Sequence, residues 1–513
     1  MAAGGKRSKA QRKQDVKRRK QEQGEKEAPE AAAAPAASPS GANLPFPVDG
    51  DACLAWLLHP ITPEEFFRDY WEQKPLHIQR KKPGYYGSLF NYKVIEGALQ
   101  SPGLKFARNI NIARFEGDEG KVMYNKEDDA KADLKYVKEK LADGCSVQCM
   151  HPQQFSTEVR SLVSTLEQFF GCLIGANSYY TPGEQQGFAP HYDDVEVFML
   201  QVEGSKKWKL FKPPEDEGKP GELAYEYSRD FEEDELEEQI WEGELSVGDL
   251  LYFPRGTVHC GVAVGDTASH HLTVSAYQRC CWADYIERLL PRAVALARDE
   301  DVDFRQGLPV NYFRYMGAVH EEMEEKDDDK SEDESELGDI PQKEDVALQR
   351  VEKHRLRAYF KREFERRMGK LIDMAVDLDG QADDAAAEFI TFRLPPVEKA
   401  EKAKLKEDDI PPTLEIRWKD PEAIRVTIDQ TETGMSIEVM HSFNNARETH
   451  MDGSDTTQVG KIEMEESVLK ALVALCTARK EFFKVKDLPE LDRAGQVALV
   501  KKLAAEGLLE MRK

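Results

Sequence analysis

The sequence lacks any apolar run that approaches the ~18 residues needed to cross a membrane. It also lacks the hydrophobic segment of a signal peptide after Met1. Its 8 cysteines include no pair of Cys-X-X-Cys motifs, which a zinc ribbon would require. These absences argue against a membrane protein and against a disulfide-stapled secreted domain. We therefore expect a soluble intracellular protein with no membrane partner.

The length and composition indicate several globular domains. A chain of 513 residues is long enough for about three domains. Hydrophobic residues make up 40% of it, including 23 Phe and 6 Trp, which is enough for real cores. The formal net charge is -25, but it is spread unevenly along the chain. This unevenness helps to locate the domain boundaries.

Residues 1–45 are basic although the chain as a whole is acidic. Between Met1 and Lys26, ten Lys or Arg stand against three Asp or Glu without apolar periodicity. This composition predicts a disordered tail. The clusters Lys6-Arg7-Ser8-Lys9 and Lys17-Arg18-Arg19-Lys20 suit nuclear or nucleolar targeting, or weak contact with RNA phosphates. A merely solvated arm is the alternative. We favour targeting, and we expect no other direct nucleic-acid binding.

The first candidate motif is His191-Tyr192-Asp193. It lies in a run from Ala189 to Val202 that is rich in β-branched and aromatic residues, which predicts a strand. Because strand side chains alternate between faces, we expect His191 and Asp193 to share one face. One imidazole and one carboxylate would then converge.

The second candidate motif is Gly256-Thr257-Val258-His259. It ends a run from Leu245 that predicts a turn, a short apolar strand, a second turn and a strand that His259 opens. Each motif alone is common by chance and usually structural. Together they match the 2-His-1-carboxylate triad, which leaves metal positions open for a cosubstrate and oxygen. We therefore predict Fe(II) held by His191, Asp193 and His259.

Several segments together resemble one known family. They are His191-Tyr192-Asp193-Asp194-Val195-Glu196-Val197-Phe198, Gln201-Val202-Glu203-Gly204, Lys206, Trp208, residues 248–259 and Trp71-Glu72-Gln73-Lys74-Pro75-Leu76. They are similar to the JmjC-type ribosomal oxygenases, the group of MINA and the nucleolar histidyl hydroxylases. The late run Arg447-Glu448-Thr449-His450-Met451 tips the likeness towards MINA. The resemblance implies an Fe(II)- and 2-oxoglutarate-dependent dioxygenase that hydroxylates the β-carbon of a histidine on a large-subunit ribosomal protein.

The resemblance also implies roles for residues around the triad. Lys206 would bind the distal carboxylate of 2-oxoglutarate, with Asn177 or Thr273 assisting. The substrate imidazole would be held by three further residues, Tyr179, Ser275 and Asn111. The pattern of Lys206-Lys207-Trp208-Lys209-Leu210 agrees with an interior Lys206, because it shares a strand face with Trp208 and Leu210. His271 is expected to line the barrel without binding the metal.

The predicted fold is α+β with four parts. After the basic tail, residues 46–281 form a double-stranded β-helix of the cupin/JmjC type. Residues 282–396 form a helical domain, interrupted by an acidic disordered insert over 321–343. By family likeness this domain makes a homodimer, whereas a plain helical lid is the alternative. Residues 397–513 alternate strands and helices in a winged-helix pattern that is not notably basic.

Two other functions are carried as alternatives. The first is a JmjC histone lysine demethylase, which would need an aromatic or acidic pocket for a methylammonium. The second is a non-catalytic nuclear scaffold, which would bind neither Fe(II) nor 2-oxoglutarate. The acidic stretch from Pro213 to Glu244 is expected as a rim loop that either attracts a basic substrate or is simply solvated.

Overall fold

The computed structural model describes residues 44–512, apart from 101–102, 118–119, 216–220, 228, 319–349, 375–377, 432–433 and 452–457. The chain divides into two compact units, Met1–Leu44 and Pro45–Lys513, and the fold described below lies within the second. Nearly all of the basic tail predicted over residues 1–45 lies outside the described residues. The whole acidic insert predicted over 321–343 lies outside them too.

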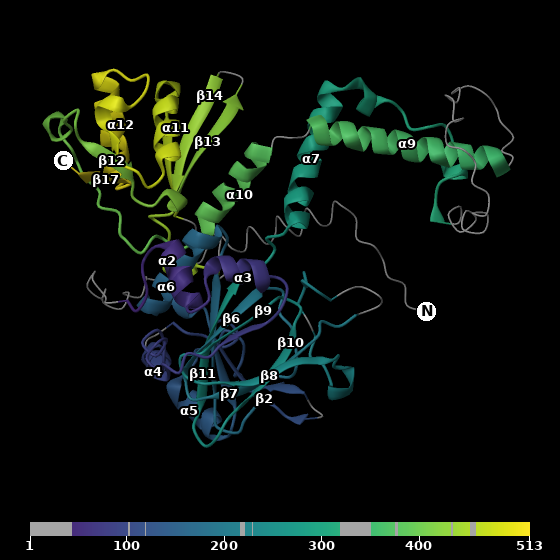
Figure 1. Ribbon diagram of the computed structural model, residues 1–513, viewed down its shortest axis with the longest axis vertical. Helices are drawn as coiled ribbons and strands as arrows, with labels where there is room; N and C mark the ends of the chain where they lie inside the picture. Colours follow the sequence, from purple (N-terminus) through teal and green to yellow (C-terminus); the bar gives the residue numbers. More distant parts are fainter. Residues whose placement is uncertain are drawn as a thin grey trace, which may run out of the picture. The chain divides into compact units, whose positions relative to one another are not determined.

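Two antiparallel β-sheets form a barrel (Figure 1). Among the described residues, the larger sheet has eight strands, in spatial order β1 (Leu76–Ile78), β9 (Leu250–Phe253), β6 (Glu196–Glu203), β11 (Ser269–Ala276), β5 (Gly175–Thr181), β4 (Ser146–Met150), β2 (Ile110–Phe115) and β3 (Lys121–Met123). The smaller sheet consists of β10 (Val258–Ala263), β7 (Lys206–Phe211) and β8 (Gln239–Leu245). Met199, Trp208 and Leu251 belong to one buried cluster that joins the two sheets. The sheets therefore face each other, as predicted.

Helices cover one end of this barrel and its flank. They are α2 (Gly50–Leu58), α3 (Pro63–Asp69), α4 (Tyr92–Gln100), α5 (Leu134–Ala142) and α6 (Thr157–Phe170). In Figure 1, α2, α3 and α6 lie together, and α2 contacts both of the others. Thr62 opens α3 with a capping box, because its hydroxyl accepts from the Glu65 N–H while its own N–H donates to the Glu65 carboxylate. Ser156 and Gly171 cap the two ends of α6.

The strand predicted over residues 189–202 begins only at Glu196. The residues before it form an irregular connection, in which His191 makes an isolated bridge to His259. The expectation that His191 and Asp193 sit on one strand is therefore wrong. The physical reason is that this segment passes from the smaller sheet, where His191 meets β10, to the larger sheet, where β6 starts.

The described part of residues 282–396 is helical, as predicted. Its elements are α7 (Trp282–Glu300), two short 3-10 turns (Val302–Arg305 and Tyr312–Arg314), α9 (Arg350–Met374) and α10 (Leu378–Phe392). Helices α7 and α9 pack through a buried cluster of Ala293, Ala297 and Leu371. The domain boundaries at 282 and 396 remain predictions.

The C-terminal region contains two small antiparallel sheets and two helices. Its elements are β12 (Glu415–Trp418), β13 (Ile424–Thr431), β14 (Gly434–His441), β15 (Gly460–Met464), α11 (Leu469–Ala478), β16 (Phe483–Lys484), α12 (Arg493–Ala505) and β17 (Leu509–Arg512). The sheet orders are β16-β12-β17 and β13-β14-β15. One core that includes Trp418, Leu472 and Leu503 joins them. Helix α10 contacts both this region, through β13 and β14, and the helical region, through α7. Strands and helices alternate in this region, as predicted.

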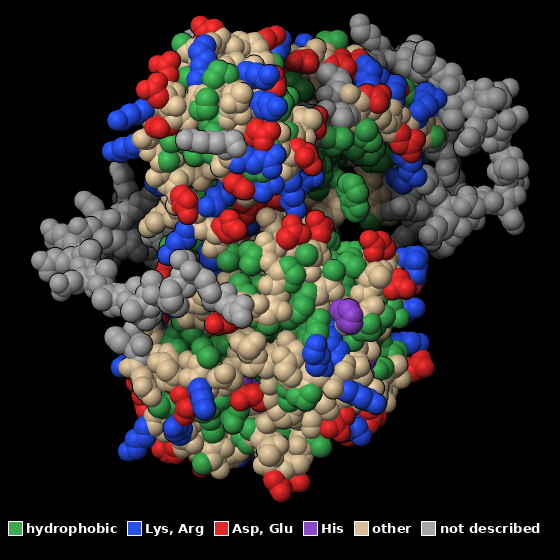
Figure 2. Space-filling view, turned by 60° about the vertical axis from the view of Figure 1, so that its left-hand side comes forward, with side chains coloured by type: hydrophobic (Ala, Val, Ile, Leu, Met, Phe, Trp, Pro, Cys, Tyr) green, Lys and Arg blue, Asp and Glu red, His purple; other side chains and the backbone are tan. Residues whose placement is uncertain are grey.

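The surface is mixed in charge. On the face drawn in Figure 2, acidic and basic side chains alternate with apolar ones, so the described residues form no continuous basic field there. This face therefore offers no continuous basic track for a nucleic acid. Within the described ranges, no helix is both long enough and apolar enough to span a membrane.

Candidate metal centre

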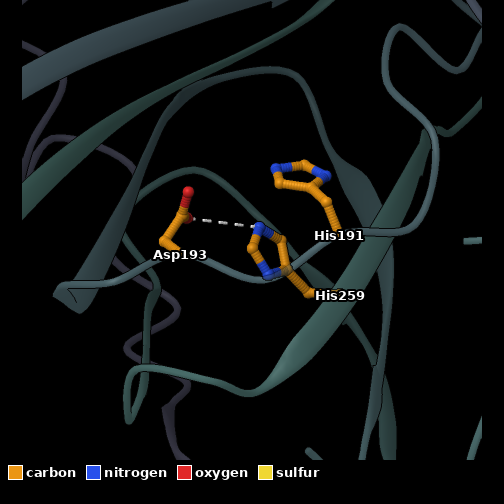
Figure 3. A group of neighbouring side chains, drawn as sticks. All are labelled: His191, Asp193 and His259. Carbon is orange, nitrogen blue, oxygen red and sulfur yellow. Dashed lines mark ion pairs between the residues drawn. The ribbon is translucent and has the colours of Figure 1, made fainter. Parts of the chain in front are cut away.

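Three side chains from the two predicted motifs meet inside the barrel. His191, Asp193 and His259 each offer a ligand atom, and these atoms lie within 4.8 Å of one another. Figure 3 shows the three side chains around one common space. The His259 Nε2 atom is 3.7 Å from the Asp193 carboxylate, and the two imidazole centroids are 4.5 Å apart. Two imidazoles and one carboxylate at these separations can bind a single metal ion.

Backbone contacts fix the two motifs against each other. The N–H of His259 donates to the His191 carbonyl at 2.8 Å, and the N–H of His191 donates back at 3.3 Å. The N–H of Gly256 donates to the Asp193 carbonyl at 3.0 Å. Gly256 has a φ of 85°, which glycine adopts without strain. Backbone hydrogen bonds therefore hold the segments that carry the three ligands against each other.

Each histidine also has one ring nitrogen occupied. His191 Nδ1 lies 2.7 Å from the Ala189 carbonyl, and His259 Nδ1 lies 3.1 Å from the Thr257 carbonyl. A carbonyl oxygen only accepts, so both Nδ1 atoms carry the proton. Each Nε2 then presents a lone pair towards the shared space, as a metal ligand must.

Burial shifts the pKa values of two of the three candidate ligands. The side chain of His259 is 3% exposed, and burial lowers its pKa well below the ordinary value, with a further contribution from His191. Burial also raises the pKa of Asp193, while His191 opposes that rise. A neutral imidazole is the form that binds a metal. A bound cation would further stabilise the ionised Asp193.

Lys206 is an interior lysine, as predicted from its position in β7. It is 4% exposed, whereas Lys207 and Lys209 on the other face of the strand are exposed. Burial lowers the pKa of Lys206 to about 7. Among the described residues, no ion pair includes Lys206, and its nearest polar partner is the Thr181 hydroxyl at 3.5 Å. A buried amine without a counter-charge can bind an anion.

One cavity contains both the triad and Lys206. Its lining consists of Tyr179, Phe188, His191, Asp193, Met199, Lys206, Trp208, His259, Cys260, Gly261, His271 and Thr273. Within the described part of the chain, the Thr273 hydroxyl and the Trp208 indole N–H are buried without a hydrogen-bond partner. These two groups are therefore available to a ligand. The sequence did not predict Trp208 as a hydrogen-bond donor to a ligand. It served there only to show which face of the strand Lys206 occupies.

A row of polar side chains crosses four strands on the inner face of the larger sheet. Asn111, Gln148, Tyr179 and His271 are successive cross-strand partners. The Asn111 amide donates to Gln148 at 2.9 Å, and the Gln148 amide donates to the Tyr179 hydroxyl at 3.0 Å. Tyr179 stacks on His271, which lines the cavity as expected. The sequence analysis did not identify Gln148 as a site residue. In β4 its side chain lies on the face opposite to that of the buried Val147.

The remaining predicted residues lie beside the cavity without lining it. Asn177 pairs with Thr273 across β5 and β11, and Ser275 pairs with Gly175 on the same two strands. Asn111 reaches the cavity only through Gln148 and Tyr179. The triad, Lys206, Thr273 and Tyr179 are thus brought together around one space. The proposed contacts of Asn177, Ser275 and Asn111 remain predictions.

Comparisons with known proteins give a family match and close relatives in sequence. Residues 148–284 match the JmjC domain family. The chain is 32% identical over 472 residues to "Ribosomal oxygenase 1" of Danio rerio, covering 88% of this chain and 78% of the relative. It is also 32% identical over 475 residues to "Bifunctional lysine-specific demethylase and histidyl-hydroxylase NO66" of Dictyostelium discoideum, covering 91% of this chain and 84% of the relative.

A solved structure also aligns with most of the chain. The X-ray structure of E. coli ycfD is aligned at 14% identity with a TM-score of 0.44, covering 88% of this chain and 98% of that one. The sequence relatives named above carry the names ribosomal oxygenase and NO66. The expected lean towards MINA rests on residues 447–451 alone and remains a prediction.

Proposed function

Because this chain belongs to the JmjC ribosomal oxygenases, we propose that it is an Fe(II)- and 2-oxoglutarate-dependent oxygenase that hydroxylates the β-carbon of a histidine in a large-subunit ribosomal protein. Family membership rests on relatives that share 32% identity over more than three quarters of their own length. The observation that carries the proposal is one cavity lined by both a metal triad and a buried, unpaired lysine.

The donor set fits Fe(II). Two imidazole nitrogens and one carboxylate oxygen form the facial triad of non-haem iron oxygenases. The carbonyls of Ala189 and Thr257 hold both imidazoles in the Nδ1–H tautomer. The imidazoles of His191 and His259 would therefore bind the ion without a change of tautomer.

The other end of the cavity fits 2-oxoglutarate. Lys206 supplies a charge-assisted bond to the distal carboxylate, and the unpartnered Thr273 hydroxyl can donate beside it. Asn177, the cross-strand partner of Thr273, supports this end of the cavity. Iron and 2-oxoglutarate together supply the activation of oxygen for the hydroxylation. The chain's own contribution is to orient the cosubstrate and exclude water.

The inner face also favours an imidazole as the substrate group. Asn111, Gln148 and Tyr179 form a chain of amide and hydroxyl groups that can both donate and accept. Ser275 lies further along the same sheet, two residues after Thr273 on β11. Tyr179, Ser275 and Asn111 are proposed to hold the substrate histidine. Among the cavity-lining residues Asp193 is the one carboxylate, and it is committed to the metal.

A demethylase activity is the second candidate, and one observation favours it. The relative from Dictyostelium discoideum is named as both a lysine-specific demethylase and a histidyl hydroxylase. The cavity does contain aromatic side chains, namely Tyr179, Phe188 and Trp208. The Lys206 ammonium, however, already lies against Trp208. Asp193 is the one carboxylate among the cavity-lining residues, and it would bind the metal, so none is left for a methylammonium. We therefore place hydroxylation first.

A homodimer is proposed through the helical domain. Several large apolar side chains on its helices and turns are exposed, namely Trp282, Ile286, Phe313, Phe364 and Ile372. Exposed apolar groups gathered on one set of elements favour association. Light scattering on the full chain should give the mass of two copies, and Phe364→Glu should shift it towards one. A wild-type protein with the mass of one copy at all concentrations would overturn the dimer.

The basic clusters within residues 1–45 are proposed to direct the protein to the nucleus and nucleolus. Replacing Lys17, Arg18, Arg19 and Lys20 by Ala in a fluorescent fusion should reduce its nuclear signal. An unchanged distribution would contradict the role. The C-terminal region is proposed to be a winged helix that acts in protein packing rather than in nucleic-acid binding.

Turnover distinguishes the candidate functions. Full-length protein is incubated with Fe(II), ascorbate and 2-oxoglutarate, together with either large-subunit ribosomal proteins or methylated histone peptides, and succinate is measured. Ribosomal proteins should stimulate succinate release, and His191→Ala should abolish it. Stimulation by methylated histone peptides alone would favour the demethylase. Absence of Fe(II) and 2-oxoglutarate binding would favour the non-catalytic scaffold.

A further inference from the structure

Residues 447–451 belong to the C-terminal region, but they lie against the barrel. They fall outside residues 148–284, which match the JmjC domain family. The 3-10 turn η9 (Arg447–Thr449) contacts η2 (Pro152–Gln154), the turn that follows β4. The function proposed above gives these C-terminal residues no part in the reaction.

His450 anchors this segment through both of its ring nitrogens. Its Nδ1 accepts a hydrogen bond from the side-chain amide of Gln153 at 3.1 Å, because an amide nitrogen only donates. Its Nε2 then donates to the Glu167 carboxylate on α6 at 2.9 Å. The His450 carbonyl also accepts from the Gln154 side chain at 3.1 Å. All three side chains bonded through the ring are at most 2% exposed, so water does not compete for these bonds.

Glu167 connects His450 to the beginning of β5. The carboxylate oxygen that accepts from His450 also accepts from the Ile174 N–H at 3.4 Å. The other oxygen accepts from the Leu394 N–H at 2.9 Å. Ile174 directly precedes Gly175, the first residue of β5. Buried hydrogen bonds therefore fix the position of residues 447–451 relative to this end of the strand.

The inner face of β5 and β11 has one end beside Lys206 and the other at Gly175. The Lys206 ammonium is 3.5 Å from the Thr181 hydroxyl, and Tyr179 lines the metal cavity. Gly175 shares the face of Thr181 and Tyr179, because side chains alternate along a strand, and it pairs with Ser275 on β11. Ser275 is proposed above to hold the substrate histidine. The end at Gly175 is therefore the one that the substrate reaches.

The Met451 side chain packs on this end of the inner face. A Cβ built on Gly175 would lie 3.6 Å from both Sδ and Cε of Met451, and 3.7 Å from the Ser275 Oγ. The thioether and the hydroxyl therefore border the same small space. Met451 is partly exposed, so another molecule can reach it. Its φ of 58° is one that a methionine keeps only where contacts hold it.

We propose that Met451 is a specificity-determining residue of the hydroxylation, and that its thioether contacts an apolar side chain next to the substrate histidine. A thioether is apolar and flexible, so it packs well against such a side chain. His450 is the positioning residue that holds Met451 beside Ser275. This inference rests on the proposed function, because it takes Ser275 as a contact of the substrate imidazole. The C-terminal region then contributes to the choice of substrate as well as to packing.

Kinetics on peptides test the role of Met451. Short synthetic peptides, each centred on one histidine of a large-subunit ribosomal protein, are incubated with the full chain, Fe(II), ascorbate and 2-oxoglutarate, and the added oxygen is measured. For a peptide that is hydroxylated, Met451→Ala should raise KM about tenfold, the lower end of what one apolar contact in a pocket contributes. The kcat should not change, because the contact is the same in the ground state and the transition state.

Two further variants complete this measurement. Met451→Leu keeps an apolar side chain of similar size, so its KM should stay close to the wild-type value. Met435→Ala is the matched control, because it truncates a partly exposed methionine on β14 of the same region. It should change neither KM nor kcat.

Alanine replacements in the peptide identify the side chain that Met451 contacts. Each apolar residue that flanks the histidine is changed in turn. One of these changes should raise KM for the wild-type protein but not for Met451→Ala, because that variant has already lost the contact. A purely structural role of Met451 would instead give the same increase with both proteins.

His450 variants test the positioning role. His450→Ala should raise KM as much as Met451→Ala, and the double variant should raise it no further, since His450 acts through Met451. His450→Gln keeps an amide that can donate to Glu167, so it should restore part of the affinity, and it replaces the alanine variant if that protein does not fold. Thermal unfolding shows which variants are folded. A lower Tm with an unchanged KM would overturn the positioning role.

The outcomes separate this inference from the proposed function. If the wild-type protein hydroxylates a peptide and folded Met451→Ala does so with the same KM, the role of Met451 is overturned and the proposed function stands. If the wild-type protein hydroxylates none of the peptides, the proposed histidyl hydroxylation is contradicted, and the role of Met451 falls with it.

Discussion

The ammonium nitrogen of Lys206 lies 4.7 Å from the centroid of the Trp208 ring, and both side chains point into the barrel from alternate positions of β7. The ring offers the cation a favourable face but no counter-charge. The nearby His259 and His271 are kept neutral by burial. This end of the cavity therefore holds one positive group, the Lys206 ammonium, without a counter-anion. The distal carboxylate of 2-oxoglutarate would supply that anion.

Replacing Lys206 by Met should weaken 2-oxoglutarate binding. A hydrogen bond to a charged group contributes about 1.5–3 kcal/mol, so the Kd should rise by roughly 10- to 150-fold. Titration in the presence of Mn(II), which keeps the protein from turning over, measures it. Lys209→Met removes an exposed lysine from the outer face of the same strand, and it should leave the Kd unchanged. Equal effects of the two variants would show that Lys206 is not the anchor.

The same lysine predicts a pH dependence of binding. Burial lowers the pKa of Lys206 to about 7, and a bound carboxylate would raise it again. The protein should therefore take up a proton on binding above pH ~7. Affinity should be constant below that pH and should fall, by at most about tenfold per unit, as the pH rises through it.

Calorimetry in buffers of different ionisation enthalpy measures this proton uptake. Lys206→Arg is the matched comparison, because a guanidinium stays charged throughout this range. The arginine variant should bind with a flat pH profile, even if its affinity is lower. An identical profile for both proteins would assign the titration to another group.

Much of this site could be predicted from local pattern. The interior position of Lys206 followed from the alternation of side chains along β7, because Lys206 shares a face with Trp208 and Leu210. The convergence of His191 with His259 was correct, but the strand assigned to His191 was wrong. Its position depends on a bridge to β10, some 70 residues away in the sequence, and local propensity does not encode such a contact.

The role of Gln148 could not be predicted for a similar reason. Its function follows from cross-strand register, which puts it between Asn111 and Tyr179. Each of these strands is short and would accept another register by composition alone. Likewise the sequence predicts α10 only as one more helix of its domain, and the structure shows that it also contacts β13 and β14. The register of Gln148 and the packing of α10 therefore depend on long-range contacts, which the local sequence pattern does not determine.

Two of the three histidines that line the cavity, His259 and His271, should behave differently on mutation. His259→Ala removes a metal ligand, so Fe(II) affinity should fall by more than about 100-fold, beyond the range of second-shell changes. His271→Asn removes an imidazole that lines the cavity and stacks on Tyr179, and the protein should still bind one Fe(II). Anaerobic titration with Fe(II) measures both. Loss of binding in His271→Asn alone would reassign the ligand set.

Gly261 should control the position of Trp208. A Cβ added at Gly261 would lie 2.7 Å from Trp208 Cδ2, so the indole would have to shift. Overpacking of this kind costs about 1–3 kcal/mol. Gly261→Ala should therefore lower the Tm and weaken 2-oxoglutarate binding by a few-fold, while Fe(II) binding persists.

Gly97→Ala is the control for this change. A Cβ at Gly97 on α4 meets no atom within 4 Å, so the substitution should leave binding intact. Alanine in a helix should also keep or slightly raise the Tm. Unchanged affinity and Tm in Gly261→Ala would show that the barrel accommodates the methyl group and that Trp208 does not depend on this glycine.

The most direct test of the central claim is tandem mass spectrometry of large-subunit ribosomal proteins after incubation with the full chain, Fe(II), ascorbate and 2-oxoglutarate. We predict the added mass of one oxygen atom on a histidine, located at its β-carbon by nuclear magnetic resonance of the modified peptide. The addition should be absent with His191→Ala. Ribosomal proteins that stay unmodified, while methylated histone peptides lose methyl groups under the same conditions, would contradict the account.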